Sequence, residues 1–301
     1  MDNVCKICGQ EFSTGHPWSD HGIKLANYFH KFYPRYSKLT NKLIIFKNPD
    51  QYLNADFENL QEMKTWLKSA GEEGKDYILE LLIKRKIKKN WIYAPGQALL
   101  RLSNLPSILY YEKQFNLPFS EICKKLGFKI KYKNKEEKVN WIAPIEIKID
   151  TREKLLLKFP NHIKTEIGCL KFGDYSLVGD EKIVIERKSI SDAAGTFSAG
   201  YDRFKRELQR AKKAGGYIVI LIENSYSDFR SIEYLPQTRH IKSNYDHLSK
   251  RMRDLYEEFS NFQIVFCDGR KQAAQITEYI LKLGKKIKKI DIQLLIDKKV
   301  L

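Results

Sequence analysis

The sequence has no long apolar run and few cysteines. Its longest purely apolar run, Ile218 to Ile222, is about five residues, whereas a membrane-spanning helix needs about 20. We therefore expect no membrane partner. The five cysteines do not have the spacing of a disulfide framework, and the first nine residues are too polar for a secretory signal. These absences exclude a small secreted scaffold and favour a cytoplasmic protein.

Acidic residues are in deficit. The chain has 37 Asp and Glu residues against 54 Lys and Arg residues, which gives a formal net charge of +17. Such an excess favours a polyanionic partner, most often nucleic acid, over the alternative of a merely Lys-rich protein. The sequence also lacks the glycine-rich Walker motif that binds nucleotide phosphates, so we expect no nucleotide cofactor.

The distribution of residue types predicts four regions in a chain long enough for two or three domains. Residues 1–40 are rich in Cys, His and aromatic side chains and predict a zinc-finger-like module. Residues 41–140 have apolar residues at helical spacing, which predicts a mainly helical DNA-binding or linker region. Strand-like and helix-like segments alternate over 141–285, as in an α/β domain around one central sheet. Residues 286–301 predict a basic tail.

The α/β region carries recognisable strands and helices. Tyr175–Val178 and Lys182–Glu186 flank Gly179 and Asp180, which predicts a β-hairpin. The segment 217–223, which is continuously apolar up to Ile222, is typical of a strand that is covered on both faces. Apolar residues recur at helical spacing over 245–259 and 270–281, which predicts two amphipathic helices.

Acidic and basic residues cluster around the predicted hairpin. Side chains alternate along a strand, so Glu186 and Lys188 should point to one face and Arg187 to the other. Asp174 enters the preceding strand and can approach Glu186 across the hairpin. Two carboxylates on one face form a hard oxygen site that suits Mg²⁺ or Mn²⁺. Lys188 could then orient or activate an attacking water.

Two more residues precede this hairpin. Asp150 ends the first predicted strand and could reach the same carboxylates, and Arg152 could bind a phosphate or pair with a carboxylate. A lone Glu-x-Lys is usually a surface ion pair. Here the Asp-x-Arg-Glu, Gly-Asp-Tyr and Glu-Arg-Lys-x-x-x-Asp elements occur together and in order over 150–192. Their combination favours a nuclease site over that alternative.

The runs 149–153, 170–175 and 184–192 resemble the nuclease domain of the XPF-type structure-specific endonucleases. The resemblance covers about residues 145–285 and implies a restriction-endonuclease-like fold of the PD-(D/E)xK class. It also implies that Asp174 and Glu186 bind the metal and that Lys188 is catalytic. The residues that it assigns to supporting roles at the catalytic site are Asp150, Arg152, Arg187 and Asp192.

Further expectations follow from the same resemblance. Members of this family cut DNA at junctions between duplex and single strand, usually as dimers, which implies a DNA substrate and a homodimer through the nuclease domain. Arg203 is the counterpart of a phosphate-binding arginine. Its loop, residues 195–203, departs from the Gly-Arg pair that is usual in the family.

The N-terminal module contains a candidate zinc site. Cys5-x-x-Cys8, followed by His21 after twelve residues, is typical of a Cys₂His₂ finger. His30 follows after eight more residues, a wider gap than the usual three to five, and His16 is another candidate. We predict a structural Zn²⁺ held by Cys5, Cys8, His21 and His30. The alternative is two free cysteines and surface histidines.

Together these features predict a Mg²⁺-dependent DNA endonuclease that acts on branched or junction DNA, in repair or recombination. One alternative is a sequence-specific endonuclease of a mobile element or phage, with its target chosen by the zinc finger. An alternative of another class is a DNA-binding protein that is catalytically inactive or depends on a partner for cleavage.

Overall fold

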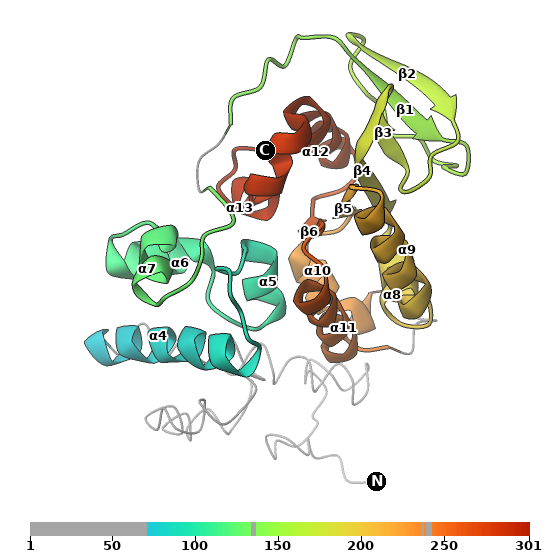
Figure 1. Cartoon of the computed structure of the whole chain (residues 1–301). Coiled ribbons are helices and arrows are strands. Elements are labelled where there is room, and N and C mark those ends of the chain that lie inside the picture. The colour runs from blue at the N-terminus through green and yellow to red at the C-terminus, as the bar shows by residue number, and fades with distance from the viewer. Residues whose placement is uncertain (1–70, 134–136, 236–237, 239–242) are drawn as a thin grey trace, which may run out of the picture. The chain divides into compact units, whose positions relative to one another are not determined.

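The computed structural model describes residues 71–133, 137–235, 238 and 243–301 (Figure 1). The predicted zinc ligands Cys5, Cys8, His21 and His30 lie outside the described residues. Within the described chain, no helix is both long and apolar enough to cross a membrane. The described residues divide into two compact units, which comprise 71–90 with 104–117, and 91–103 with 118–301.

The first unit contains helices α4 (Gly71–Lys88) and α6 (Ile108–Phe115). Ser107 caps α6 by accepting a hydrogen bond from the Tyr110 amide. Tyr111 is buried, and its hydroxyl donates to the Ile78 carbonyl of α4 at 3.2 Å. A buried aromatic ring and a satisfied hydroxyl therefore join the two helices of this unit.

The second unit is built on one mixed six-stranded sheet with the order β2-β1-β3-β4-β5-β6 (Figure 1). Its strands are β1 (Ile145–Asp150), β2 (Ile163–Gly168), β3 (Tyr175–Leu177), β4 (Asp180–Lys188), β5 (Tyr217–Ile222) and β6 (Phe262–Phe266). β3 runs antiparallel to β1 and β4, while the other neighbouring pairs are parallel. The predicted α/β class and the predicted hairpin, now β3–β4, are confirmed.

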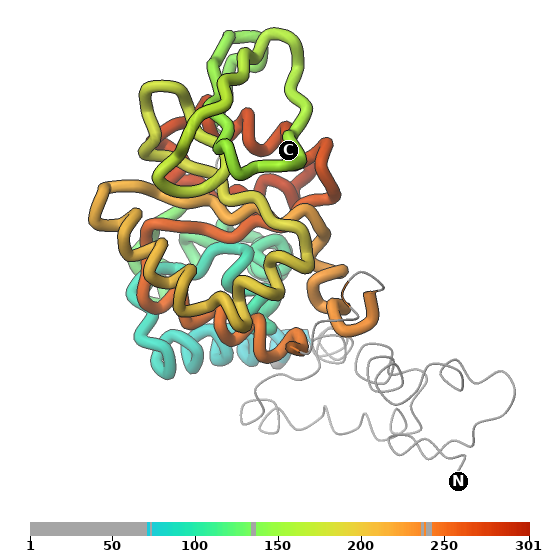
Figure 2. Tube along the Cα trace, turned by 90° about the vertical axis from the view of Figure 1, so that its right-hand side faces the viewer, coloured from blue at the N-terminus to red at the C-terminus, as the bar shows by residue number. Residues whose placement is uncertain are grey.

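Helices cover both faces of this sheet (Figure 1 and Figure 2). Every residue of β5 is buried, as the apolar run predicted, because Tyr217, Val219 and Leu221 face one core and the alternate residues face the other. We call the core that contains Tyr217 the first core and the core that contains Ile218 the second core. The helices that contribute to the second core are α8 (Ile190–Phe197), α9 (Tyr201–Lys213), α10 (Tyr226–Arg230) and α11 (Tyr245–Glu258). The first core is completed by α12 (Arg270–Leu283), the 3₁₀ helix η5 (Gly284–Lys289) and α13 (Ile292–Asp297).

The C-terminal segment differs from the predicted basic tail. Ile287, Ile290 and Leu295 are buried in the first core, together with Leu301. The lysines of η5 dominate the composition, but the apolar residues between them are spaced to reach the core. Burial of these apolar side chains makes residues 286–301 part of the α/β unit.

Two short helices complete the unit. They are α5 (Gln97–Leu102) and α7 (Phe119–Lys125). The C-terminal carbonyls of α5 are bound by side chains from other helices, because Tyr226 donates to the Arg101 carbonyl and Arg253 to the Leu102 carbonyl. These bonds satisfy backbone groups that a helix end leaves open.

Candidate active site

The β3–β4 hairpin brings two predicted metal ligands together. Asp174 lies directly before β3, where its amide donates to the Ile185 carbonyl at 2.7 Å and its Oδ2 accepts the Arg187 amide at 2.7 Å. Gly173 has a φ of +66°, and a Cβ at this position would lie 2.9 Å from the Ile185 carbonyl oxygen. Glycine is therefore required for Asp174 to approach β4 this closely.

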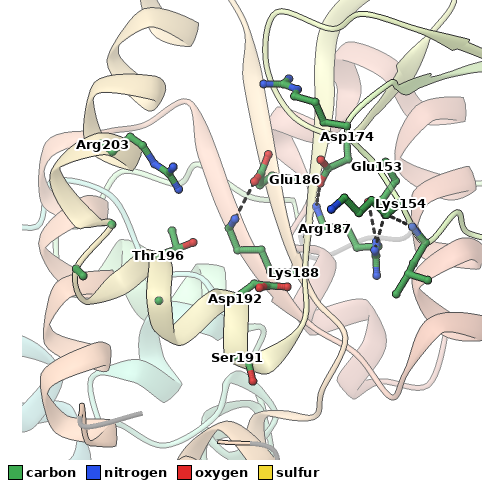
Figure 3. Close-up of a pocket in the computed structure, with 15 residues that line it drawn as sticks. Glu153, Lys154, Asp174, Glu186, Arg187, Lys188, Ser191, Asp192, Thr196 and Arg203 are labelled. Carbon is green, nitrogen blue, oxygen red and sulfur yellow. Dashed lines mark hydrogen bonds and ion pairs between the residues drawn. The ribbon is translucent and has the colours of Figure 1, made fainter. Parts of the chain in front are cut away.

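A cavity of about 810 Å³ opens beside the hairpin (Figure 3). Most of the predicted site residues line it, and these are Arg152, Asp174, Glu186, Arg187, Lys188, Asp192 and Arg203. In Figure 3, Glu186 and Lys188 point toward each other, and Arg203 extends from α9 on another side of the cavity. The cavity thus combines two carboxylates with several cations, an arrangement that suits a bound phosphodiester and its counterion.

The two carboxylates are close enough to influence each other. Burial and the negative charge of Glu186 together raise the pKa of Asp174 to about 7, against the opposing effect of the hydrogen bond from the Arg187 amide. Within the described residues, the hydrogen bonds use Oδ2 of Asp174 and Oε1 of Glu186. One oxygen of each carboxylate is left for a ligand. Two crowded carboxylates are stabilised by a cation.

These residues fit a divalent cation whose coordination is shared with water or substrate. No group of three or more His, Cys, Asp or Glu side chains in the described chain is placed to hold a metal. Mg²⁺ in particular is commonly held by one or two carboxylates, with waters and phosphate oxygens as its other ligands. The donor set of Asp174 and Glu186 matches that mode and not an all-protein cage.

Lys188 lies between the carboxylates and helix α9. Its Nζ is 2.7 Å from Glu186 Oε1 and 5.6 Å from the centre of the Phe204 ring. Its side chain is mostly buried, as is that of Glu186. The ion pair and the aromatic face fix the position of the ammonium group in the cavity. This geometry confirms that Glu186 and Lys188 share one face of β4, whereas the Arg187 side chain points to the other.

Asp192 lies at the start of α8. Ser189 caps this helix by accepting a hydrogen bond from the Asp192 amide, and the Ser189 hydroxyl donates to Asp192 Oδ2 at 2.6 Å. The acidic side chain is favourable at this helix N-terminus. It therefore holds the connection between β4 and α8, directly after Lys188.

Asp150 does not line the cavity, which differs from the prediction that it could reach the other carboxylates. Its side chain is 1% exposed, and it accepts hydrogen bonds from the Leu170 amide and from the backbone and guanidinium of Arg152. Burial alone would raise its pKa, but these bonds outweigh burial and lower it. Asp150 thus fixes the end of β1, and Arg152 pairs with this carboxylate.

An ionic network that the sequence did not reveal holds Arg187. Its guanidinium forms two hydrogen bonds with Glu153, at 2.7 and 3.1 Å, and another with Glu223 at 2.7 Å. Arg270 of α12 lies 3.9 Å from Glu223 and donates to the Leu155 carbonyl. Glu223 directly follows the apolar run of β5, and that position was the only signal in the sequence. The network ties three separate segments to the back of β4.

Glu207 of α9 is a further acidic residue near the cavity that the sequence did not indicate. Burial raises its pKa, and the charge of Glu186 raises it further, while Lys188 lowers it. Its carboxylate accepts a hydrogen bond from the Gly173 amide. Glu207 thus holds the turn that carries Asp174 in place. This role depends on a contact between Glu207 and Gly173, which are 34 positions apart in the sequence.

Comparison with known proteins identifies the region that contains this site. Residues 148–280 match the model of the ERCC4 domain, which confirms the resemblance to the XPF-type nuclease domain. None of the curated proteins compared with the chain matches it.

Two solved structures of XPF from Aeropyrum pernix, one of them a complex with DNA, are similar at 21% and 20% sequence identity. The matches cover 48% and 47% of this chain, and 66% and 67% of those chains, with TM-scores of 0.36 and 0.35. This chain therefore spans about two thirds of the length of the structures that it matches.

Proposed function

We propose that this chain, whose residues 148–280 match the ERCC4 domain, is a metal-dependent DNA endonuclease. The observation that carries the proposal is the placement of Asp174, Glu186 and Lys188 around one cavity of that domain. An ERCC4 nuclease domain implies hydrolysis of a phosphodiester bond. The net charge of +17 supports a polyanionic substrate.

Asp174 and Glu186 are the proposed ligands of Mg²⁺ or Mn²⁺. A divalent cation held there would neutralise charge on the phosphate and acidify a water molecule. Arg187 fixes Asp174 through its backbone amide, while its guanidinium is anchored to Glu153 and Glu223. The protein thereby holds both carboxylates in place before substrate binds.

Lys188 is the group proposed to orient the attacking water and to help lower the pKa of that water. Its ammonium is held by Glu186 Oε1 at 2.7 Å and acts through its positive charge and its remaining N–H donors. Arg203 and Lys154 add positive charge to the cavity wall, where they are placed to hold phosphate oxygens. Asp192 follows the end of β4, which carries Glu186 and Lys188, and Asp150 ends β1, where its backbone amide donates to the Asp174 carbonyl at 2.8 Å.

Branched or junction DNA is the proposed substrate, in repair or recombination. This choice is supported by the ERCC4 domain and by the resemblance to XPF-type nucleases, which cut such structures. The zinc module of residues 1–40, the helical region 41–140 and a homodimer through the nuclease domain remain predictions. In the proposal, the two N-terminal regions contribute to the choice of DNA.

Cleavage of a labelled DNA panel tests the function. The panel contains single strand, duplex, flap, fork, four-way junction and long native DNA, each incubated with the full chain in Mg²⁺ and in Mn²⁺. Cutting at branch points supports the proposal, and cutting of long duplex at a few fixed sites would favour sequence-chosen cleavage. Retained DNA binding without cutting of any substrate would favour an inactive or partner-dependent protein.

Matched variants show whether the proposed site performs the cutting. Asp174→Asn removes one proposed metal ligand with little change of shape, and Asp180→Asn removes an exposed carboxylate from the same hairpin. Only Asp174→Asn should abolish cleavage. Equal activity of both variants would place the chemistry elsewhere.

A further inference from the structure

An exposed aromatic side chain lies in the segment directly before α5. Tyr93 is 52% exposed and its neighbour Ile92 is 60% exposed, although Trp91 before them is buried. Among the residues that the structure describes, the Tyr93 side chain has no hydrogen bond and no ring contact. Packing in a core therefore does not account for this tyrosine, and its ring is available to a ligand.

Backbone pairing holds this segment in place. Tyr93 forms a parallel bridge with Lys129, and the Lys129 amide donates to the Ile92 carbonyl at 2.9 Å. Side chains of directly paired residues lie on the same face of the pair. Trp91 and Phe128, which are next to this pair in the sequence, are both buried and anchor the two segments. The Tyr93 ring and the exposed Lys129 side chain are therefore presented to solvent together.

The sequence around both segments is basic and lacks acidic residues. No Asp or Glu occurs between Glu80 and Glu112, or between Glu121 and Glu136. The second of these stretches contains six lysines. Those that the structure shows as exposed are Lys124, Lys125, Lys129 and Lys133. An aromatic ring beside several lysines, in a stretch without carboxylates, gives a local surface that attracts polyanions.

This surface lies at the end of the sheet opposite to the cavity. Lys131 donates to the carbonyl of Ser260, just before β6, and the Tyr132 hydroxyl is hydrogen-bonded to Tyr217, the first residue of β5. The cavity, in contrast, lies at the carboxyl end of β4, which runs parallel to β5. The six residues of β5 span about 17 Å. The Tyr93 surface is therefore separate from the cavity.

We propose that Tyr93 and Lys129 bind an unpaired nucleic-acid strand, with one base stacked on the Tyr93 ring and a phosphate paired with Lys129. Every base has a π face, so stacking on an aromatic side chain binds single strands with little sequence preference. The bases of a duplex are stacked on one another and offer no free face. The ligand is therefore the single-stranded arm of a branched DNA. This assignment deepens the proposed function, on which it rests for the choice of DNA.

The charge of the surface decides between this ligand and a protein partner. A protein that covered Ile92 and Tyr93 would have to supply acidic groups for the lysines around them, because unpaired charges at an interface oppose binding. A nucleic-acid strand supplies both an anion and an aromatic base in every nucleotide. It therefore matches the aromatic and the cationic part of the surface at once.

Binding of single-stranded DNA in EDTA tests this site without cleavage. The probe is a short fluorescent oligothymidine, and its anisotropy is titrated with the full chain. Tyr93→Ala should weaken binding about tenfold, because the stacking of one base is lost. Tyr93→Trp should bind at least as tightly as the wild type, since tryptophan also stacks. Lys129→Gln should reduce the slope of log K against log salt by about 0.7, as expected for one phosphate of a single strand.

Matched controls alter exposed side chains elsewhere in the same unit. Ile142→Ala and Lys164→Gln should both bind the oligothymidine like the wild type. A blunt duplex should bind the Tyr93→Ala variant and the wild type with nearly equal affinity. Unchanged binding of the oligothymidine by Tyr93→Ala would overturn the proposal and leave the surface to a protein partner. An equal loss of duplex binding would overturn the stacking of a base.

Photocrosslinking gives a direct readout of the contact. An oligonucleotide that carries 5-iodouracil forms an adduct with a stacked aromatic side chain on irradiation, and mass spectrometry should locate the adduct at Tyr93. Adducts at other aromatic residues only would overturn the proposal. Because no cleavage is measured, a chain that binds through Tyr93 but cuts no DNA would contradict the proposed nuclease function alone.

Discussion

Two acidic pairs of the α/β unit, Asp174 with Glu186 and Asp291 with Asp297, are both partly or fully buried but have different surroundings. Asp291 accepts hydrogen bonds from the Gln97 and Leu294 amides, at 2.6 and 3.1 Å. Asp297 accepts from the side chains of Gln97, Gln293 and Arg101. The oxygens of this second pair are thus satisfied by the protein.

The first pair faces a cavity, and each of its carboxylates uses one oxygen in the contacts described above. Burial nevertheless raises the pKa of a member of each pair, Asp174 to about 7 and Asp291 to about 6. A raised pKa alone therefore does not separate a reactive site from a structural one. The informative difference is whether the oxygens have protein donors or open space.

The largest contrast should come from replacing one member of each pair. Asp174→Asn should lower the rate of DNA cleavage by about 10³-fold, because a metal held there supplies several kcal/mol of charge stabilisation. Its thermal unfolding in EDTA should be unchanged or shifted upward, because one of two crowded negative charges is removed. Single-turnover cleavage and calorimetry measure these effects. A large loss of stability without loss of cleavage would reverse the roles of the pairs.

Asp291→Ala should have the opposite profile. It leaves the buried Gln97 and Leu294 amides without their acceptor and removes the cap of α13, so the free energy of unfolding should fall by about 2–4 kcal/mol. Cleavage below the melting temperature should continue. Urea unfolding at pH 7 measures the loss, and Asp268→Ala, which removes an exposed carboxylate, is the control. Equal stability of the two variants would contradict the structural role of Asp291.

The pH dependence of unfolding adds a second readout for Asp291. Its pKa is about 6 in the folded protein against an ordinary value of 3.8, so the folded state binds the proton more tightly. The extra stability that comes from this tighter proton binding is fully present below about pH 4 and is lost as the pH rises through 6, whereas the contacts to the Gln97 and Leu294 amides remain at pH 7. Asp291→Ala should flatten this slope between pH 4 and 6. A slope equal to that of the wild type would assign the dependence to other groups.

Glu223→Gln tests an acidic residue that belongs to neither pair but reaches Asp174 through Arg187. Its carboxylate binds Arg187, whose backbone amide in turn holds Asp174. The variant keeps one acceptor but removes the charge, so cleavage should fall about tenfold, as for outer partners of metal sites. Glu257→Gln on α11 is the control, and the rate at saturating DNA is the measurement. An unchanged rate would show that Glu153 alone suffices to hold Arg187.

Periodicity accounts for what could be predicted from the sequence. The alternation of side chains along β4 correctly predicted that Lys188 and Arg187 point to opposite faces of the sheet. The unbroken apolar run correctly indicated that β5 is covered on both faces. These features depend on residues that are close in the chain. The α/β class and most of the cavity residues followed from them and from the order of the motifs.

Contacts between distant segments account for what could not be predicted. The carboxylate of Asp150 is occupied by the Leu170 amide, which no local pattern indicates. The structural role of Gln97 could not be predicted, because its partners Asp291 and Asp297 lie near the other end of the chain. At the C-terminus, lysine content masked apolar residues such as Ile287, which is fully buried. Composition describes solvent-facing atoms well and says little about which apolar residues reach a core.

Arg203→Ala should have the smallest effect, and it tests the positive charge that lines the cavity beside Asp174 and Glu186. Arg203 is exposed and lines the cavity, so it should contribute one phosphate contact and no chemistry. DNA binding to an Asp174→Asn background should weaken about fivefold, and the slope of log K against log salt should fall by about one. Lys213→Ala, at the other end of α9, should change neither quantity. If binding is unchanged and the cleavage rate falls instead, Arg203 acts on the reacting phosphate. Asp174 and Glu186 would then have a positively charged partner in catalysis.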